Sequence, residues 1–297
     1  MNNLYYKPSG KVNPLSILYL LLAMCVVVPI LDFVYTYAIL YIPLIYLNFL
    51  CVAGVAFALG FIANFVIGLG KVRNVLVAVI YGLLIGIAGV YVSWIIWLSH
   101  HFEVDYMTFV ESFEGFSNAI GFANEQGTWG IGRSGGMVDG VMLTIVWIIE
   151  LVAMIGFPVF FAYSKACEPF IENDDSWAEV TPIGPFQFIA NKEELKRQLE
   201  TKNYEPVVNM PAATTDTGAS HSIFSLYHAE NRSQAKEFYL SVSNMEEGTD
   251  KDGNLKFDEK SLINFIHITK EAGQQLLARI NNGGVRNTEV ETTDDSI

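Results

Sequence analysis

The sequence has few charged residues, and one long stretch has almost none. Only 16% of its 297 residues are Asp, Glu, Lys or Arg, against about 25% in soluble domains. The 55 residues from Leu15 to Leu69 contain one charged side chain, Asp32. Residues 165–297, in contrast, carry 13 of the 18 Lys and Arg and 23 of the 31 Asp and Glu. This distribution excludes a uniformly soluble protein and indicates a membrane part joined to a soluble part.

Motifs of common enzymes and metal sites are also lacking. The chain contains no Walker loop, nucleophile elbow or H-E-x-x-H. His100 and His101 are adjacent at the end of an apolar run, whereas His221 and His228 are seven residues apart, so on a strand they would point to opposite faces. The three cysteines lie in or beside apolar runs, which excludes a disulfide framework outside the cell. Nothing in these patterns favours an enzyme.

The apolar runs are long enough to cross a bilayer four times, because a hydrocarbon core about 30 Å thick needs roughly 20 apolar residues per helix. Pro29, Asp32 and the aromatic residues that follow predict the first turn at a membrane interface. The predicted fold is membrane α-helical, with four transmembrane helices and a C-terminal soluble α+β domain. The expected parts are a cytoplasmic segment at 1–14, helices at about 15–33, 38–69 and 75–99, an extracytoplasmic loop at 100–140, a helix at 141–163, a cytoplasmic domain at 164–284 and a disordered tail at 285–297.

Basic residues predict the orientation of these helices. Lys7 and Lys11 precede the first helix, Lys71 and Arg73 lie between the second and third, and Lys165 follows the fourth. The loop between the third and fourth helices has one basic residue and six acidic ones. By the positive-inside rule, both termini and the soluble domain are expected in the cytoplasm.

The extracytoplasmic loop combines an amphipathic pattern with a glycine-rich segment. Residues 106–120 place apolar side chains at three- and four-residue steps, which predicts one helix lying on the ends of the spans as a cap. Gly130, Gly132 and Gly135 match the G-x-G-x-x-G spacing of dinucleotide sites. Since they precede a membrane span and do not follow a strand in a βαβ unit, we interpret them as the segment that returns the chain to the bilayer.

The soluble half predicts a small α+β domain. Residues 181–188 are expected to form a turn-rich entry, followed by a helix near 191–201 that Asn191 caps. Residues 221–228 and 237–243 are β-like and are expected to pair as a hairpin. Residues 262–268 fit either a strand or a helix, and residues 270–280 are expected to be helical.

Four polar residues within the spans are candidates for an intramembrane site: Glu150, Asp32, Asn48 and Asn64. Glu150 lies near the middle of the fourth helix, where a carboxylate facing lipid is costly, so it is expected to be protonated, to face the bundle or to contact a cavity. Its role is either structural, through a hydrogen bond to Asn48, Asn64 or Ser93, or that of a proton or cation relay. Asp32 is expected to be hydrated at the outer end of the first helix.

Two further motifs concern packing and metal binding. Small residues in the third helix predict a close helix contact, at Gly82, Gly86 and Gly89. A loop in the soluble half resembles an EF-hand calcium loop through Asp250, Asp252, Asn254 and Asp258. Leu255 and Ser261 replace the glycine and the final glutamate of that loop, so an ordinary turn is favoured and calcium is at most a weak candidate cofactor.

These features leave two classes of function open. The first is a multi-pass membrane protein that anchors a cytoplasmic protein- or ligand-binding domain, as an anchor, sensor or assembly subunit. The alternative is an oligomeric ion or proton channel, or a small transporter subunit, that uses Glu150. The expected partners are the lipid bilayer and either a protein or a second copy of the chain. The net charge of −13 argues against nucleic acid.

Overall fold

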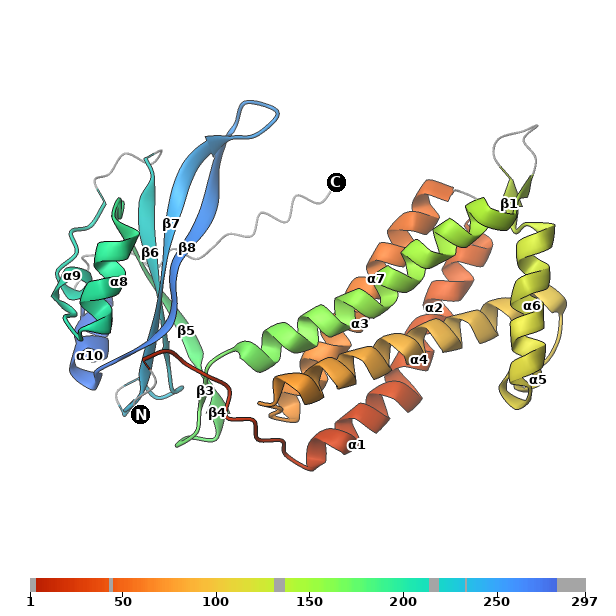
Figure 1. Cartoon of the computed structure of the whole chain (residues 1–297), viewed down its shortest axis with the longest axis horizontal. Coiled ribbons are helices and arrows are strands. Elements are labelled where there is room, and N and C mark those ends of the chain that lie inside the picture. The colour runs from red at the N-terminus through yellow and green to blue at the C-terminus, as the bar shows by residue number, and fades with distance from the viewer. Residues whose placement is uncertain (1–3, 43–44, 131–136, 214–218, 233, 282–297) are drawn as a thin grey trace. The chain divides into compact units, whose positions relative to one another are not determined.

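The chain forms two compact units. Its structure, a computed structural model, describes residues 4–42, 45–130, 137–213, 219–232 and 234–281. One unit spans Pro8–Cys167, and the other combines Met1–Lys7 with Glu168–Ile297 (Figure 1). Four long apolar helices and a C-terminal region with a four-stranded antiparallel sheet confirm the predicted fold class. The expected tail at 285–297 and the glycines at 132 and 135 lie outside the described residues.

The helical unit consists of four spans with mean hydropathies between 2.3 and 2.6. The first span is one continuous helix with three parts, because a short π-helical segment, η1, lies between two α-helical parts. The bounds are α1 (Leu15–Leu22), η1 (Ala23–Val27), α2 (Val28–Tyr41), α3 (Ile45–Leu69), α4 (Val75–Phe102) and α7 (Gly140–Cys167). All four spans are at least 24 residues long, which is sufficient to cross a bilayer.

The predicted turn between the first two spans was placed wrongly. The helix continues through Asp32 and ends only at Tyr41. Pro29 lies at the start of α2, directly after the π-turn, where a missing backbone N–H is tolerated. Phe33, Tyr37 and Tyr41 follow one another at four-residue steps, with stacked rings 5.5 and 6.0 Å apart. The aromatic residues therefore form one helix face and not a turn.

Glycines allow α4 and α7 to approach closely. A Cβ added at Gly82 would lie 2.6 Å from the carbonyl oxygen of Pro158, and one at Gly86 would lie 2.8 Å from Cα of Ile155. Both obstacles are backbone atoms of α7. At Gly89 the added Cβ would instead meet a methyl group of Leu59 in α3, at 2.8 Å. Only glycine therefore permits the observed backbone separation at the first two positions.

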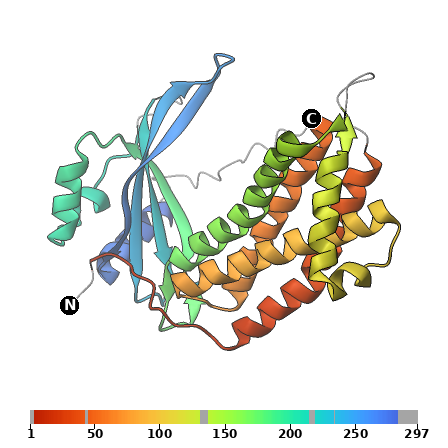
Figure 2. The same cartoon turned by 45° about the vertical axis from the view of Figure 1, so that its right-hand side comes forward.

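The loop after α4 contains two helices, α5 (Met107–Glu111) and α6 (Phe113–Gln126), where one was predicted. Ser112 ends α5 and caps α6, because its Oγ accepts the backbone N–H of Gly115 at 3.0 Å. Because the helix breaks at Ser112, the apolar residues before and after it do not share one continuous face, and Phe113 is 79% exposed. Phe109 and Phe116 still pack with Ile95 and Leu98 at the end of α4. Figure 2 shows α6, in yellow, crossing the ends of the long helices.

The second unit is a four-stranded antiparallel sheet covered on one face by helices (Figure 1). Its strand order is β5-β6-β7-β8. The bounds are β5 (Glu179–Gln187), α8 (Lys192–Glu200), α9 (Glu205–Val208), β6 (His221–His228), β7 (Phe238–Thr249), β8 (Leu255–Ile268) and α10 (Lys270–Asn281), preceded by the short pair β3 (Phe170–Ile171) and β4 (Ser176–Trp177). The predicted β6–β7 hairpin and the α8 cap at Asn191 are confirmed, and residues 262–268 belong to a strand.

The predicted turn-rich entry at residues 181–188 is mostly strand β5. Two prolines, Pro182 and Pro185, suggested turns. However, β5 is an edge strand. It pairs with β6 along one side and only with residues 211–213 on the other, so it does not need every backbone N–H. A register irregularity between Ile183 and Phe186 accommodates the second proline and its cis peptide bond.

The N-terminus completes the other edge of this sheet. The backbone N–H of Tyr6 donates to the carbonyl of Phe265, and that of His267 donates to the carbonyl of Leu4 at 2.8 Å. The Tyr5 hydroxyl donates to Glu200 Oε1 at 2.8 Å, and burial together with this bond raises the pKa of Tyr5 to about 12. Since residues 4–6 pair with β8, the N-terminal segment belongs to the same compact unit as the sheet.

Removal of residues 1–7 should therefore expose the edge of β8. We expect faster hydrogen exchange at the His267 amide, because its acceptor, the Leu4 carbonyl, is lost. Exchange in the central strand β6 should not change, since both its neighbours remain. Hydrogen exchange measured by mass spectrometry on peptides from β8 and β6 provides the comparison. Equal exchange of β8 in the two chains would contradict the pairing.

The close approach of α4 and α7 predicts a sharp difference between two glycines. Gly82→Ala should destabilise the helical unit by about 1–3 kcal/mol, because the new methyl group meets the α7 backbone. Gly54→Ala in α3 should be neutral or slightly stabilising, since no atom lies within 4 Å of its added Cβ. Thermal unfolding of both variants in the same detergent tests the prediction. Similar midpoints would show that the glycine contact is not tight.

Candidate functional site

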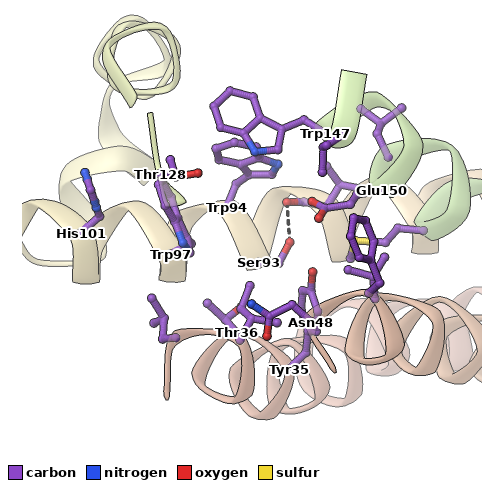
Figure 3. Close-up of a pocket in the computed structure, with 18 of the residues that line it drawn as sticks. Tyr35, Thr36, Asn48, Ser93, Trp94, Trp97, His101, Thr128, Trp147 and Glu150 are labelled. Atoms are coloured by element: carbon purple, nitrogen blue, oxygen red, sulfur yellow. Dashed lines mark hydrogen bonds between the residues drawn. The ribbon is translucent and has the colours of Figure 1, made fainter. Parts of the chain in front are cut away.

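A cavity of about 380 Å³ lies within the helical unit (Figure 3). All four spans line it, and each does so with the half nearest the loop that joins α4 to α7. The lining residues that the structure describes are Tyr35, Thr36, Ile39, Leu40 and Ile42 from the end of the first span, Asn48, Phe49 and Val52 from α3, Val90, Ser93, Trp94, Trp97, His100 and His101 from α4, Thr128 from the loop, and Val146, Trp147, Glu150, Leu151 and Met154 from α7.

Glu150 provides the one carboxyl group among these lining residues. It lies ten residues into α7, which corresponds to about 15 Å along the helix, and thus near the middle of a bilayer. Its carboxyl makes no hydrogen bond to any described residue. The expected partner Ser93 instead donates from Oγ to the carbonyl of Val90, at 3.0 Å (Figure 3). Asn48 and Ser93 line the same cavity, whereas Asn64 does not.

The wall opposite Trp94 and Trp147 contains hydrogen-bond acceptors without partners (Figure 3). Thr36 Oγ1 and Asn48 Oδ1 are buried, and neither has a hydrogen-bond partner. Tyr35, on the same helix as Thr36, lies close enough to Glu150 for an electrostatic interaction. Buried polar groups in proteins are nearly always hydrogen-bonded, so these atoms can bond to water or to a polar ligand.

Aromatic rings form another part of the cavity surface. Trp94 and Trp147 meet edge to face with centroids 4.8 Å apart, and Trp94 also contacts Trp97 at 5.7 Å. Trp97 stacks on His101 at 4.9 Å, with an angle of 11° between the rings. These contacts fix the rings relative to one another, so the cavity has a defined shape.

The position of Asp32 differs from the sequence prediction. Its side chain was expected to be hydrated, but it has no exposed surface, and neither carboxyl oxygen has a hydrogen-bond partner. The cause is the longer helix α2, in which Asp32 lies nine residues before the end at Tyr41 and faces the bundle. Asp32 does not line the cavity, but Tyr35 lies within electrostatic reach of both Asp32 and Glu150.

The calcium-like loop forms the turn between β7 and β8. Asp250 Oδ1 accepts the backbone N–H groups of Asp252 and Asn254 at 2.9 and 2.8 Å. These bonds, those from Asn254 foremost, hold the pKa of Asp250 below its usual value. Asp258 pairs with Lys256 at 2.8 Å. Within the described residues, no group of three or more His, Cys, Asp or Glu is arranged to hold a metal ion.

Comparisons with models of known protein families, with curated proteins and with solved structures give no match to this chain. The inference of function therefore rests on the geometry of the cavity.

Sequence reasoning identified Glu150, Asn48 and Ser93 but not the other walls of the cavity. A signal for the tryptophans was present, because Val90, Trp94, Trp97 and His101 recur at three- and four-residue steps and so share one face of α4. The same holds for Trp147 and Glu150 on α7. Thr36 had no such signal, since its burial depends on where the first span ends.

The cavity should admit water, because polar groups line it. In a chain without its three native cysteines, Val146→Cys should react readily with a water-soluble thiol reagent, since Val146 lines the cavity. Ile148→Cys should react slowly, because Ile148 lies outside the cavity, is 54% exposed and faces lipid, where thiols stay protonated. Mass spectrometry of the modified chains gives the two rates. Equal rates would show that the cavity is closed to solvent.

Proposed function

We propose that this protein is a membrane sensor. Its helical unit binds a small ligand in the cavity beside Glu150, and its acidic soluble unit responds to that ligand and binds a protein partner. The observation that carries the proposal is the cavity itself: about 380 Å³ within the bundle, with unpartnered polar atoms on its wall. Its volume is within the range of small-molecule sites, roughly 300–1,000 Å³.

The closed inner half of the bundle favours a sensor over a channel. The cavity extends no further along α7 than Met154, which is 3% exposed. Immediately beyond it, Gly86 lies against the backbone of Ile155, and Gly82 lies against that of Pro158. A site that lies in one half of the bundle and is closed by backbone contacts toward the other half can bind a ligand without conducting it.

The soluble unit is connected to the helical unit twice. At one junction α7, which carries Trp147 and Glu150, ends at Cys167, and strand β3 begins at Phe170. At the other junction the strand residues 4–6 precede the first span. A ligand that shifts α7 acts on strand β3, and one that shifts the first span acts on the strand that pairs with β8. The soluble unit can therefore respond to an occupied cavity at two places.

The proposed orientation places the soluble unit and both termini in the cytoplasm. The support is the distribution of basic residues, with five on the side of the N-terminus and one in the loop between α4 and α7. In this orientation the cavity receives its ligand from the outer solution or from the outer half of the bilayer. The acidic soluble unit then meets a cytoplasmic protein, and nucleic acid is excluded by charge.

Transport is the second candidate, and the position of Asp32 favours it. Asp32 and Glu150 lie nine and ten residues from the outer ends of their helices, so both are about 15 Å deep. Two carboxyl groups at one depth, with Tyr35 near both, could relay a proton. This mechanism requires the contacts at Gly82 and Gly86 to open, and an oligomer would then enclose the path.

A cavity-filling variant tests the sensor without knowledge of the ligand. Val146→Phe adds a ring to the cavity wall, as a bound ligand would, and should change hydrogen exchange of residues 4–6 and 168–171 by about fivefold or more. Ile148→Phe is the matched control, since it lies two residues away, outside the cavity, and is 54% exposed. Hydrogen exchange of the full chain in lipid nanodiscs gives the comparison.

Two outcomes would contradict the sensor. Equal exchange in the two variants would show that the cavity is not coupled to the sheet. A proton flux into sealed vesicles that Glu150→Gln abolishes would favour transport instead. Ile148→Phe should leave both measurements at the level of the unmodified protein.

A further inference from the structure

We infer that the cavity binds an organic ammonium ion, namely a primary or secondary amine that carries an apolar body and sits beside Glu150. This inference rests on the proposed ligand site and names the chemical class of its ligand. It is drawn from four properties of the cavity: its charge, its hydrogen-bonding capacity, its aromatic surface and its volume.

The charge of the cavity favours a cation. Glu150 is the one acid on its wall, and none of the described lining residues is Lys or Arg. No described residue donates a hydrogen bond to the Glu150 carboxyl. An anionic ligand would be repelled by Glu150 in its ionised form, and an apolar ligand would leave this carboxyl buried without a partner. A cation at this position pairs with the carboxylate and removes both problems.

The unpartnered polar atoms can accept hydrogen bonds from N–H donors. Thr36 Oγ1 and Asn48 Oδ1 lack partners, and Glu150 adds two acceptor oxygens when ionised. A primary ammonium carries three N–H groups that match such a set of acceptors. A quaternary ammonium carries the same charge but has no N–H to donate, so it would leave Thr36 and Asn48 unpaired.

The aromatic walls fit both ends of such a ligand. Trp94 and Trp147 meet at 4.8 Å, and Figure 3 shows them close to Glu150. Indole faces attract cations more strongly than other aromatic rings. Tyr35 and Phe49 line the same cavity and offer apolar contact. The indole faces can therefore contact the charge beside Glu150, while the other rings contact the apolar body of the ligand.

The volume excludes a bare metal ion as the natural occupant. A cavity of about 380 Å³ is far larger than one ion, and the described residues contain no group of three or more His, Cys, Asp or Glu that could hold a metal. Two kinds of molecule could supply the ammonium group. The ammonium belongs either to a free amine from solution or to the ethanolamine headgroup of a membrane lipid.

The experiment compares three probes of similar shape. The full chain is placed in nanodiscs of phosphatidylcholine, and equilibrium dialysis measures binding of 2-phenylethylammonium, its trimethylammonium analogue and neutral 2-phenylethanol. We expect the primary ammonium to bind at least about tenfold more tightly than the alcohol, because it forms charge-assisted hydrogen bonds. The trimethylammonium analogue should bind more weakly than the primary ammonium.

Two variants connect this preference to the cavity. Glu150→Gln should reduce binding of the ammonium to the level of the alcohol, whereas Glu125→Gln, an exposed position on α6 outside the cavity, should leave it unchanged. Trp147→Leu should weaken binding of the ammonium several-fold through loss of its ring face. If Glu150→Gln does not fold, the comparison of probes on the unmodified protein still decides the inference.

Nanodiscs that contain phosphatidylethanolamine separate the two sources. Weaker binding of the primary ammonium in these discs indicates that the lipid headgroup occupies the cavity, and unchanged binding indicates a free amine. Both results support the inference. Equal affinity for ammonium and alcohol, or unchanged binding in Glu150→Gln, would overturn it. The sensor proposal would survive that result, because the Val146→Phe comparison uses no ligand.

Discussion

The close approach of α4 and α7 determines the shape of the helical unit. At Gly82 and Gly86 the two backbones come so near that no side chain fits between them. Toward the loop that joins α4 to α7, the same two helices carry Trp94 and Trp147 in place of glycine. These large side chains hold the helices apart, and a cavity forms in that half of the bundle. Packing in one half of the bundle therefore creates space in the other.

This arrangement also explains how a polar residue is tolerated at mid-bilayer depth. Glu150 lies on the part of α7 that borders the cavity, one turn before Met154, where close packing begins. A carboxyl facing lipid at this depth would cost several kcal/mol. Facing a cavity lined by Asn48 and Thr36, it can be solvated or paired instead. The chemistry of the site thus follows from where the bundle is open.

The soluble unit depends on a different constraint, the edges of its sheet. Strand β5 forms one edge. Its prolines do not offer a full set of N–H donors to a further strand, and residues 211–213 bridge to its end. Residues 4–6 cover the other edge along part of β8. The N-terminus is held there before the chain enters the first span, so the two units are linked by two connections. That double link is the physical basis for expecting one unit to respond to the other.

The sequence by itself determined the number of spans, the division into two halves and the helix–sheet content of the soluble part. These properties depend on composition and on local periodicity, which a short window of residues contains. It also marked Glu150, since a single acid among apolar residues is conspicuous. The end of the first span was predicted wrongly. Pro29 and the aromatic residues after it are compatible both with a turn and with a helix that contains a π-helical segment, and composition alone does not distinguish the two.

Only the tertiary structure decided which polar residues share a site. Asn48 and Asn64 look alike in sequence, yet only Asn48 lines the cavity. Asp32 was expected in water and is buried. The pairing of Leu4 and Tyr6 with β8 joins residues about 260 positions apart. In each case the outcome depends on which helix face or strand edge meets a distant partner, and local sequence does not contain that information.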